Sequence, residues 1–167
     1  MILKFQLVAA AAAMLVTGAA SAVGPGDLGT IDNATVTISN THFGHQPFVD
    51  TYLFDTTGVG LGVGVVFDFT LPKLDIDFSS LSFVDLTTST VLATDTDGTD
   101  GWALATVLPG AHEYAFEVAG TPVGQLGGTY LGVLKTFVPQ PVPEPGTYAM
   151  LLAGLGVVGF LARRRRD

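Results

Sequence analysis

The sequence predicts an all-β protein: an antiparallel β-sandwich or jelly-roll-like body of about eight strands, flanked by an N-terminal signal peptide and a C-terminal transmembrane helix. Three observations predict this. Through the middle of the chain, apolar residues recur at every second position, which is the period of a half-buried strand. Turn residues separate these runs at the 8 to 12 residue spacing of sandwich strands. The two ends are instead continuous apolar runs.

The first element, residues 1–22, has the pattern of a secretory signal peptide. Lys4 supplies a positive charge near the start, an apolar run follows over residues 5–16, and Ala20-Ser21-Ala22 supplies small residues at the end. Charged, apolar and small-residue regions in this order direct a chain to export and cleavage. The alternative, a core helix, is disfavoured because the run has no amphipathic period. We therefore expect export by the Sec machinery, with cleavage between Ala22 and Val23.

The second element, residues 23–137, is the β-rich body. Its clearest strand lies within residues 59–71, where every odd position is apolar, whereas the even positions from 58 to 64 are all glycine. This alternation predicts a strand with its apolar face buried. The glycines are expected to form a smooth face where another backbone or sheet packs closely. Shorter alternating runs occupy residues 34–39, 74–79 and 112–118.

The charge of the body excludes some partners. Without residues 1–22 and 143–167, which hold five of the seven basic residues and two of the fifteen acids, 13 acids and 2 lysines remain, a net charge of −11. Such a surface repels phosphate backbones and anionic lipid head groups, so nucleic-acid binding is excluded. The chain also has no cysteine, and therefore no thiolate nucleophile and no disulfide.

The third element is the C-terminal tail. Residues 138–146 form a proline-rich spacer that contains Pro143-Glu144-Pro145, residues 147–162 carry no charge, and residues 163–167 hold Arg163, Arg164, Arg165 and Arg166. As a helix the uncharged run would span roughly 24 Å, slightly less than a typical hydrocarbon core. Arginines directly after such a run mark the cytoplasmic side. The tail is thus expected to be a transmembrane helix that places the body outside the cytoplasm.

These tail residues resemble a known family. A Pro-Glu-Pro motif, a short glycine-rich apolar helix and a terminal arginine cluster are together similar to the PEP-CTERM sorting signal of Gram-negative bacteria. The resemblance implies that an exosortase, a membrane-embedded cysteine transpeptidase-like enzyme, cleaves near Pro143, Glu144 and Pro145, which would then be substrate residues. It also implies an inner-membrane precursor, followed by transfer to the cell surface or an exopolysaccharide matrix.

Asp50 is the most unusual residue of the body. Alternation places it on the same face as Phe48, Tyr52 and Phe54, and a carboxylate among aromatic rings needs hydrogen-bond donors or a cation. We expect it to accept hydrogen bonds from loop backbone; a cation site is the alternative. The segment from Phe48 also resembles the F-x-D-x-A pattern of one PEP-CTERM subgroup, although Tyr52 stands where that pattern has alanine.

Two further sites could hold metals. Asp95, Asp97 and Asp100 resemble part of a calcium loop, but Asp100 stands where an EF-hand has glycine, so only a looser Ca²⁺ site or an acidic hairpin tip is expected. Next to them, Trp102 is either a sugar platform or a core residue. For zinc, His42 and His45 are ligands of the right type, but no second cluster completes the site.

The sequence therefore favours a non-enzymatic, exported surface or matrix protein whose body is a structural or binding module of exopolysaccharide and biofilm material. A calcium-dependent carbohydrate-binding module is the alternative. A hydrolase is the third reading, but no nucleophile motif occurs, and Glu113 and Glu117 lie on an outward strand face. No cofactor is expected other than this Ca²⁺.

Overall fold

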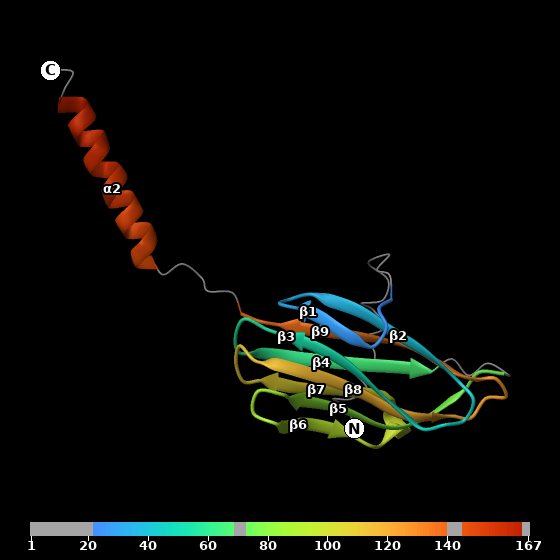
Figure 1. Cartoon of the computed structure of the whole chain (residues 1–167). Helices are drawn as coiled ribbons and strands as arrows, with labels where there is room; N and C mark the ends of the chain where they lie inside the picture. Colours follow the sequence, from blue (N-terminus) through green and yellow to red (C-terminus); the bar gives the residue numbers. More distant parts are fainter. Residues whose placement is uncertain (1–21, 69–72, 140–144, 165–167) are drawn as a thin grey trace.

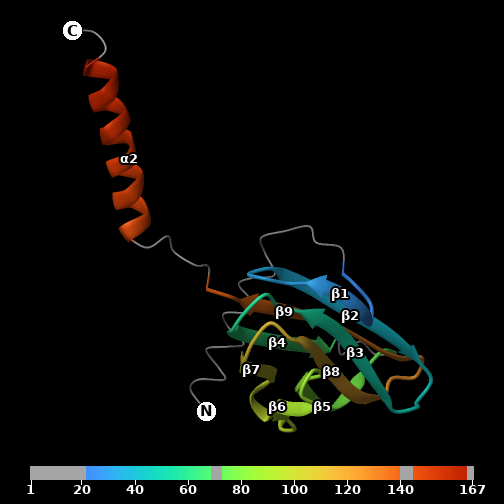
Figure 2. The same cartoon turned by 60° about the vertical axis from the view of Figure 1, so that its left-hand side comes forward.

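The computed structural model of this chain describes residues 22–68, 73–139 and 145–164. The described residues form nine strands packed as two layers, followed by a helix that stands apart from them (Figures 1 and 2). The strands are β1 (Gly26–Thr30), β2 (Thr35–Phe43), β3 (Phe48–Asp55), β4 (Gly60–Asp68), β5 (Ile76–Asp85), β6 (Thr90–Asp95), β7 (Trp102–Leu108), β8 (Glu113–Pro122) and β9 (Gly127–Phe137). A short 3₁₀ turn, η1 (Gly98–Asp100), precedes β7, and the helix is α2 (Pro145–Arg164).

The two sheets follow the order β1-β3-β8-β5-β6 and β2-β9-β4-β7. The chain behaves as one long antiparallel hairpin that is then rolled up: β2 pairs with β9, β3 with β8, β4 with β7 and β5 with β6. This nested pairing is that of a jelly roll, and the predicted sandwich is confirmed. The prediction missed β1, which adds a ninth strand and pairs with β3 in parallel, so the sandwich is not purely antiparallel.

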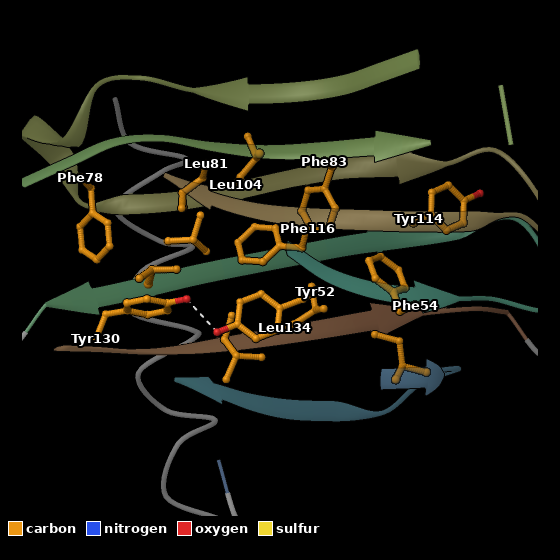
Figure 3. Packing of buried hydrophobic residues seen from close by; sticks show 14 of the residues in the cluster. Tyr52, Phe54, Phe78, Leu81, Phe83, Leu104, Tyr114, Phe116, Tyr130 and Leu134 are labelled. Carbon is orange, nitrogen blue, oxygen red and sulfur yellow. Dashed lines mark hydrogen bonds between the residues drawn. The ribbon is translucent and has the colours of Figure 1, made fainter. Parts of the chain in front are cut away.

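The core between the sheets is aromatic. Tyr52 and Phe54 come from β3, Phe83 from β5 and Phe116 from β8, and all four are buried. The rings of Phe83 and Phe116 lie with their centroids 4.9 Å apart, and Phe54 meets Phe83 edge to face at 6.3 Å (Figure 3). Such contacts add to the stability that burial of apolar area itself supplies.

β4 corrects one prediction. Its apolar odd-numbered residues were expected to face the core, but the even-numbered face does so, with Val66 in the core cluster and Gly64 against the Phe116 ring. The odd-numbered residues lie on the outer face, where Val65 packs with Ala103 of β7 in a small second cluster. The physical reason is space: the Phe116 ring of the opposite sheet fills the volume over Gly64, so no side chain fits at that position of the inner face.

The glycine face itself is as expected. A side-chain β-carbon at Gly64 would lie 2.3 Å from the Phe116 ring, and one at Gly60 would lie 2.6 Å from the carbonyl oxygen of Phe137. Another sheet and another backbone therefore both pack closely on this strand, as predicted for a row of glycines.

Candidate functional site: the C-terminal tail and the polar clusters of the body

The tail begins where β9 ends. Just after Phe137, the buried Val138 is held by Asn33 from the β1–β2 connection: the Asn33 side-chain amide donates to the Val138 carbonyl at 2.7 Å, and the Val138 N–H donates to Asn33 Oδ1 at 3.0 Å. Asn33 has a left-handed backbone, with φ of 53°. Sequence reasoning did not find this pair, because 105 positions separate its members.

The helix α2 starts at Pro145, two residues before the predicted boundary, and includes Arg163 and Arg164. Proline suits a first helical position because its missing N–H would have no intrahelical partner there. The apolar side chains of Met150, Leu152 and Val158 are exposed. The structure thus confirms the predicted helix over residues 147–162. In the described part of the chain, no helix combines the length and the apolar character needed to cross a membrane, so the predicted membrane span is not confirmed.

The remaining sorting and cleavage residues are only partly covered. Pro143, Glu144, Arg165, Arg166 and Ala20 lie outside the described residues. At the predicted mature N-terminus, the Val23 N–H donates to the Thr37 carbonyl at 2.9 Å, and the Ser39 N–H donates to the Val23 carbonyl at 3.0 Å. Residue 23 is thus paired with β2, and cleavage before it stays a prediction.

Asp50 points inward, as the alternation predicted, and is only 7% exposed. Three donors converge on its Oδ2: the Tyr130 hydroxyl at 2.6 Å, His42 Nε2 at 2.8 Å and the Asn40 side-chain amide at 2.9 Å. The donors are thus side chains of β2 and β9 and not the loop backbone that we expected. Asp50 therefore joins the two sheets, since β3 belongs to one and its partners to the other.

The hydrogen-bond chain continues to a second tyrosine. The hydroxyl oxygens of Tyr52 and Tyr130 are 2.7 Å apart (Figure 3). Because the single Tyr130 proton is donated to Asp50, the Tyr52 hydroxyl acts as donor to Tyr130. Burial, with the neighbouring Asp50 carboxylate adding to it, raises the pKa of both tyrosines above its ordinary value. Both phenols therefore stay protonated donors, and His42 covers the cluster by stacking on Phe48 with ring centroids 3.8 Å apart.

A second carboxylate–histidine pair lies where β5 and the β7–β8 connection meet. Buried Asp85 accepts from His112 Nδ1 at 2.7 Å and from the Thr88 backbone N–H at 3.1 Å. Burial alone would raise the pKa of Asp85, but these hydrogen bonds outweigh it, so that the pKa lies below its ordinary value. Sequence reasoning did not single out Asp85, because its partner is 27 residues away.

The lowered pKa of Asp85 predicts a pH dependence. A carboxylate whose pKa is lowered by folding stabilises the fold above the unfolded value and ceases to do so as pH falls through the folded value. We expect Asp85→Asn to lower the free energy of unfolding by about 1–3 kcal/mol at pH 7. It should also flatten the loss of stability below about pH 4. Urea unfolding between pH 2 and 7 measures both. Asp77→Asn, at an exposed carboxylate, is the control. If the free energy of unfolding fell equally steeply with decreasing pH in Asp85→Asn and in the wild type, the prediction would be contradicted.

The three aspartates of the predicted calcium site have structural roles where they are described. Asp95 is buried at the end of β6 and accepts from the Asp97 N–H at 3.2 Å, and Asp97 caps η1 by accepting from the Thr99 N–H at 3.0 Å. The side chain of Asp100 lies outside the described part. Among the described residues, no group of three or more His, Asp or Glu is arranged to hold a metal. The calcium site therefore stays a prediction.

Trp102 is packed against the core. Its ring meets Phe78 edge to face at a centroid distance of 5.8 Å, and Gly98 of η1 lies so close that an added β-carbon would be 2.5 Å from the indole. Trp102 is half-buried and packs against the core cluster, which favours the core interpretation of this tryptophan.

Comparison with known proteins decides the nature of the tail. The model of the PEP-CTERM protein-sorting motif matches residues 141–166. The chain carries a PEP-CTERM sorting motif. The match confirms the resemblance drawn from Pro143, Glu144, Pro145 and the arginine cluster, and the motif implies an exported protein that is sorted by an exosortase. It does not extend to the F-x-D-x-A segment, and membership of that subgroup stays a prediction.

For the body, no curated protein matches. Among solved structures, the pre-peptidase C-terminal domain of a collagenase from Bacillus anthracis is similar at 11% identity and a TM-score of 0.42, over 71% of this chain and 99% of that one. PliG from Salmonella Typhimurium, a periplasmic inhibitor of g-type lysozyme, is similar at 15% identity and a TM-score of 0.38, over 66% of this chain and 97% of that one. Similarity at this level assigns no function to the body.

Proposed function

We propose that this chain is an exported precursor which is held at the inner membrane, cut by an exosortase near Pro143-Glu144-Pro145, and delivered to the cell surface or extracellular matrix. The observation that carries the proposal is the PEP-CTERM sorting motif at residues 141–166. The end of β9 supports it, since the motif begins only three residues after the anchored Val138. The folded body and the segment to be cut are thus adjacent but distinct.

In this proposal the body is a structural or binding module of exopolysaccharide and biofilm material. The chain is the substrate of an enzyme and has no catalytic role of its own. The composition of the body supports its role as a matrix module. With 13 acids and 2 lysines, the body has a net charge of −11. A strongly acidic surface stays soluble and resists non-specific association with anionic lipids and nucleic acids. A two-layer sandwich with a closed aromatic core gives a compact module for such a matrix.

The proposal is tested by replacing Pro143, Glu144 and Pro145 with alanine in the full-length chain. The wild type should mature with Val23 at its N-terminus and a C-terminus near Pro145, whereas the variant should keep the tail and stay in the membrane fraction, with processing reduced by about tenfold or more. Mass spectrometry of the two termini in each cell fraction measures this. The control is alanine at Pro139 and Gln140, which lie in the same spacer but before the matched motif, and it should leave processing unchanged.

The arginine cluster gives a second arm of the same experiment. Lysines at positions 163–166 keep the charge and should keep sorting, while four glutamines should impair it. Surface or matrix material that still contains residues 147–166 would contradict the proposed sorting. Processed protein that does not co-purify with the exopolysaccharide fraction would contradict the proposed role of the body.

A further inference from the structure

We propose that Asn33 is a positioning residue for sorting: its side chain holds Val138 to the body and so fixes the last residue of the sandwich, beyond which the exosortase can engage the chain. The enzyme in this inference rests on the proposed function, whereas the anchor itself is a property of the fold. We call the pair of hydrogen bonds between Asn33 and Val138 the exit clamp.

The exit clamp extends the β2–β9 ladder by one step. Thr35 is the first residue of β2 and pairs with Lys135, and the Thr136 N–H still donates to the Ala34 carbonyl at 3.3 Å. Hydrogen-bonded pairs alternate along an antiparallel ladder, so the N–H and C=O of Asp32 would be the next groups to face Val138, but at Asn33 the backbone turns away with φ of 53°. The side-chain amide takes their place, because it offers a donor and an acceptor in the arrangement of a peptide group. Both backbone polar groups of Val138 are satisfied in this way.

The segment that carries Asn33 is itself held in place. The Ile31 N–H donates to the Asp55 carbonyl at 3.0 Å, and Asp32 accepts from the Thr57 N–H at 3.0 Å. Since the two residues before Asn33 are bound to β3 and to the connection after it, the Asn33 amide is presented to Val138 from a fixed position. A positioning role needs such support.

We call the end of β9 together with Val138 the exit strand. Its other side is packed against glycines. The Val138 side chain is buried and lies over Gly58 and Gly60, where added β-carbons would be 3.6 Å and 3.1 Å from its methyl groups. At Gly60 the β-carbon would also be 2.6 Å from the Phe137 carbonyl oxygen, which is too close for any residue but glycine. The exit strand is thus held by hydrogen bonds from Asn33 and by close packing on β4.

The clamp sets the reach of the spacer. Residues 139–144 separate Val138 from the start of α2, and the seven residue steps from Val138 to Pro145 span at most about 25 Å. Pro145, the last residue of the Pro-Glu-Pro motif and the first residue of α2, therefore lies within this reach of the clamped Val138. Without the clamp, the end of β9 would fray, and upstream residues would join the segment open to cleavage.

The decisive variant is Asn33→Gly. Glycine accepts the left-handed backbone at position 33 without strain and removes only the side chain, whereas alanine would add strain to the loss of the clamp. Asn33 is exposed, so the variant should fold. Ser89→Gly is the matched control, because Ser89 has φ of 54° and lies in the β5–β6 turn, away from the tail. Gly60→Ala disturbs the exit strand from the opposite side, independently of Asn33.

The experiment uses the full-length chain from cells without exosortase, and in parallel the sorted product from cells that have it. In the full-length chain from cells without exosortase, Asn33→Gly should speed hydrogen exchange at the Val138 amide by roughly tenfold. Proteinase K should also cut upstream of residue 138, as it should in Gly60→Ala, and not in wild type or Ser89→Gly. In the sorted product from cells with exosortase, mass spectrometry should find that the Asn33→Gly variant has C-termini that are heterogeneous or shifted upstream.

Two results would overturn the inference. Unchanged exchange and an unchanged proteinase K boundary in Asn33→Gly would show that the clamp does not hold the exit strand. A moved boundary with a wild-type C-terminus in the sorted product would show that the clamp does not limit the exosortase. A wild-type chain left uncut near Pro145 would instead refute the proposed function and the sorting role of Asn33 together, while the exchange data would still decide whether the clamp exists.

Discussion

Asp50→Asn is expected to lower the free energy of unfolding by about 1.5–3 kcal/mol, because it removes the charge on which three hydrogen bonds converge. The asparagine keeps the size of the side chain and one acceptor oxygen, so packing hardly changes. Urea unfolding followed by tryptophan fluorescence measures the difference, since Trp102 is the one tryptophan of the chain. The loss should be the same with and without a chelator if hydrogen bonding is the whole role of Asp50.

Two controls separate the cluster from general effects of charge. Asp77→Asn removes an exposed carboxylate from the same sheet and should change stability by less than about 0.5 kcal/mol. Tyr130→Phe removes one donor and leaves the carboxylate charged, so its cost should not add to that of Asp50→Asn in the double variant. An Asp50→Asn variant as stable as the Asp77→Asn control would contradict the inward network, and chelator sensitivity of the wild type alone would point to a bound cation.

Gly64→Ala is expected to destabilise the sandwich by about 1–3 kcal/mol, although alanine is normally the better residue in a strand. The reason is overpacking: the new methyl group would lie 2.3 Å from the Phe116 ring, which is buried and packed against Phe83. The ring can move away only by displacing its neighbours in the core. Thermal and urea unfolding of the full chain measure the effect.

Gly62→Ala is the matched control for this substitution. It lies on the same strand and the same face, but its β-carbon would meet the Leu108 side chain at the longer distances of 3.3–3.4 Å. A leucine tip can shift by a few tenths of an ångström, so the cost should stay below about 1 kcal/mol. Equal effects at the two positions would show that the even-numbered face of β4 does not bear on the Phe116 ring.

Several features followed from local sequence patterns alone. The alternation around Asp50 predicts its inward direction, because successive side chains of any strand point to opposite faces. The order of Pro143-Glu144-Pro145, apolar run and arginine cluster predicts the sorting motif, because a segment that an enzyme reads as an extended peptide needs no tertiary partner. Both signals lie within a few consecutive residues, so no long-range contact is needed to find them.

Only the tertiary structure decided which groups meet across the sandwich. Period-two alternation shows that β4 has two unlike faces, but the ring that selects the glycine face as the inner one comes from Phe116 of the opposite sheet. The donors to Asp50 include Tyr130, 80 residues away, and the exit clamp joins residues 105 positions apart. Such pairs depend on which strands become neighbours and in which register. That depends on how the whole hairpin rolls up to fill its core, and no local pattern contains that information.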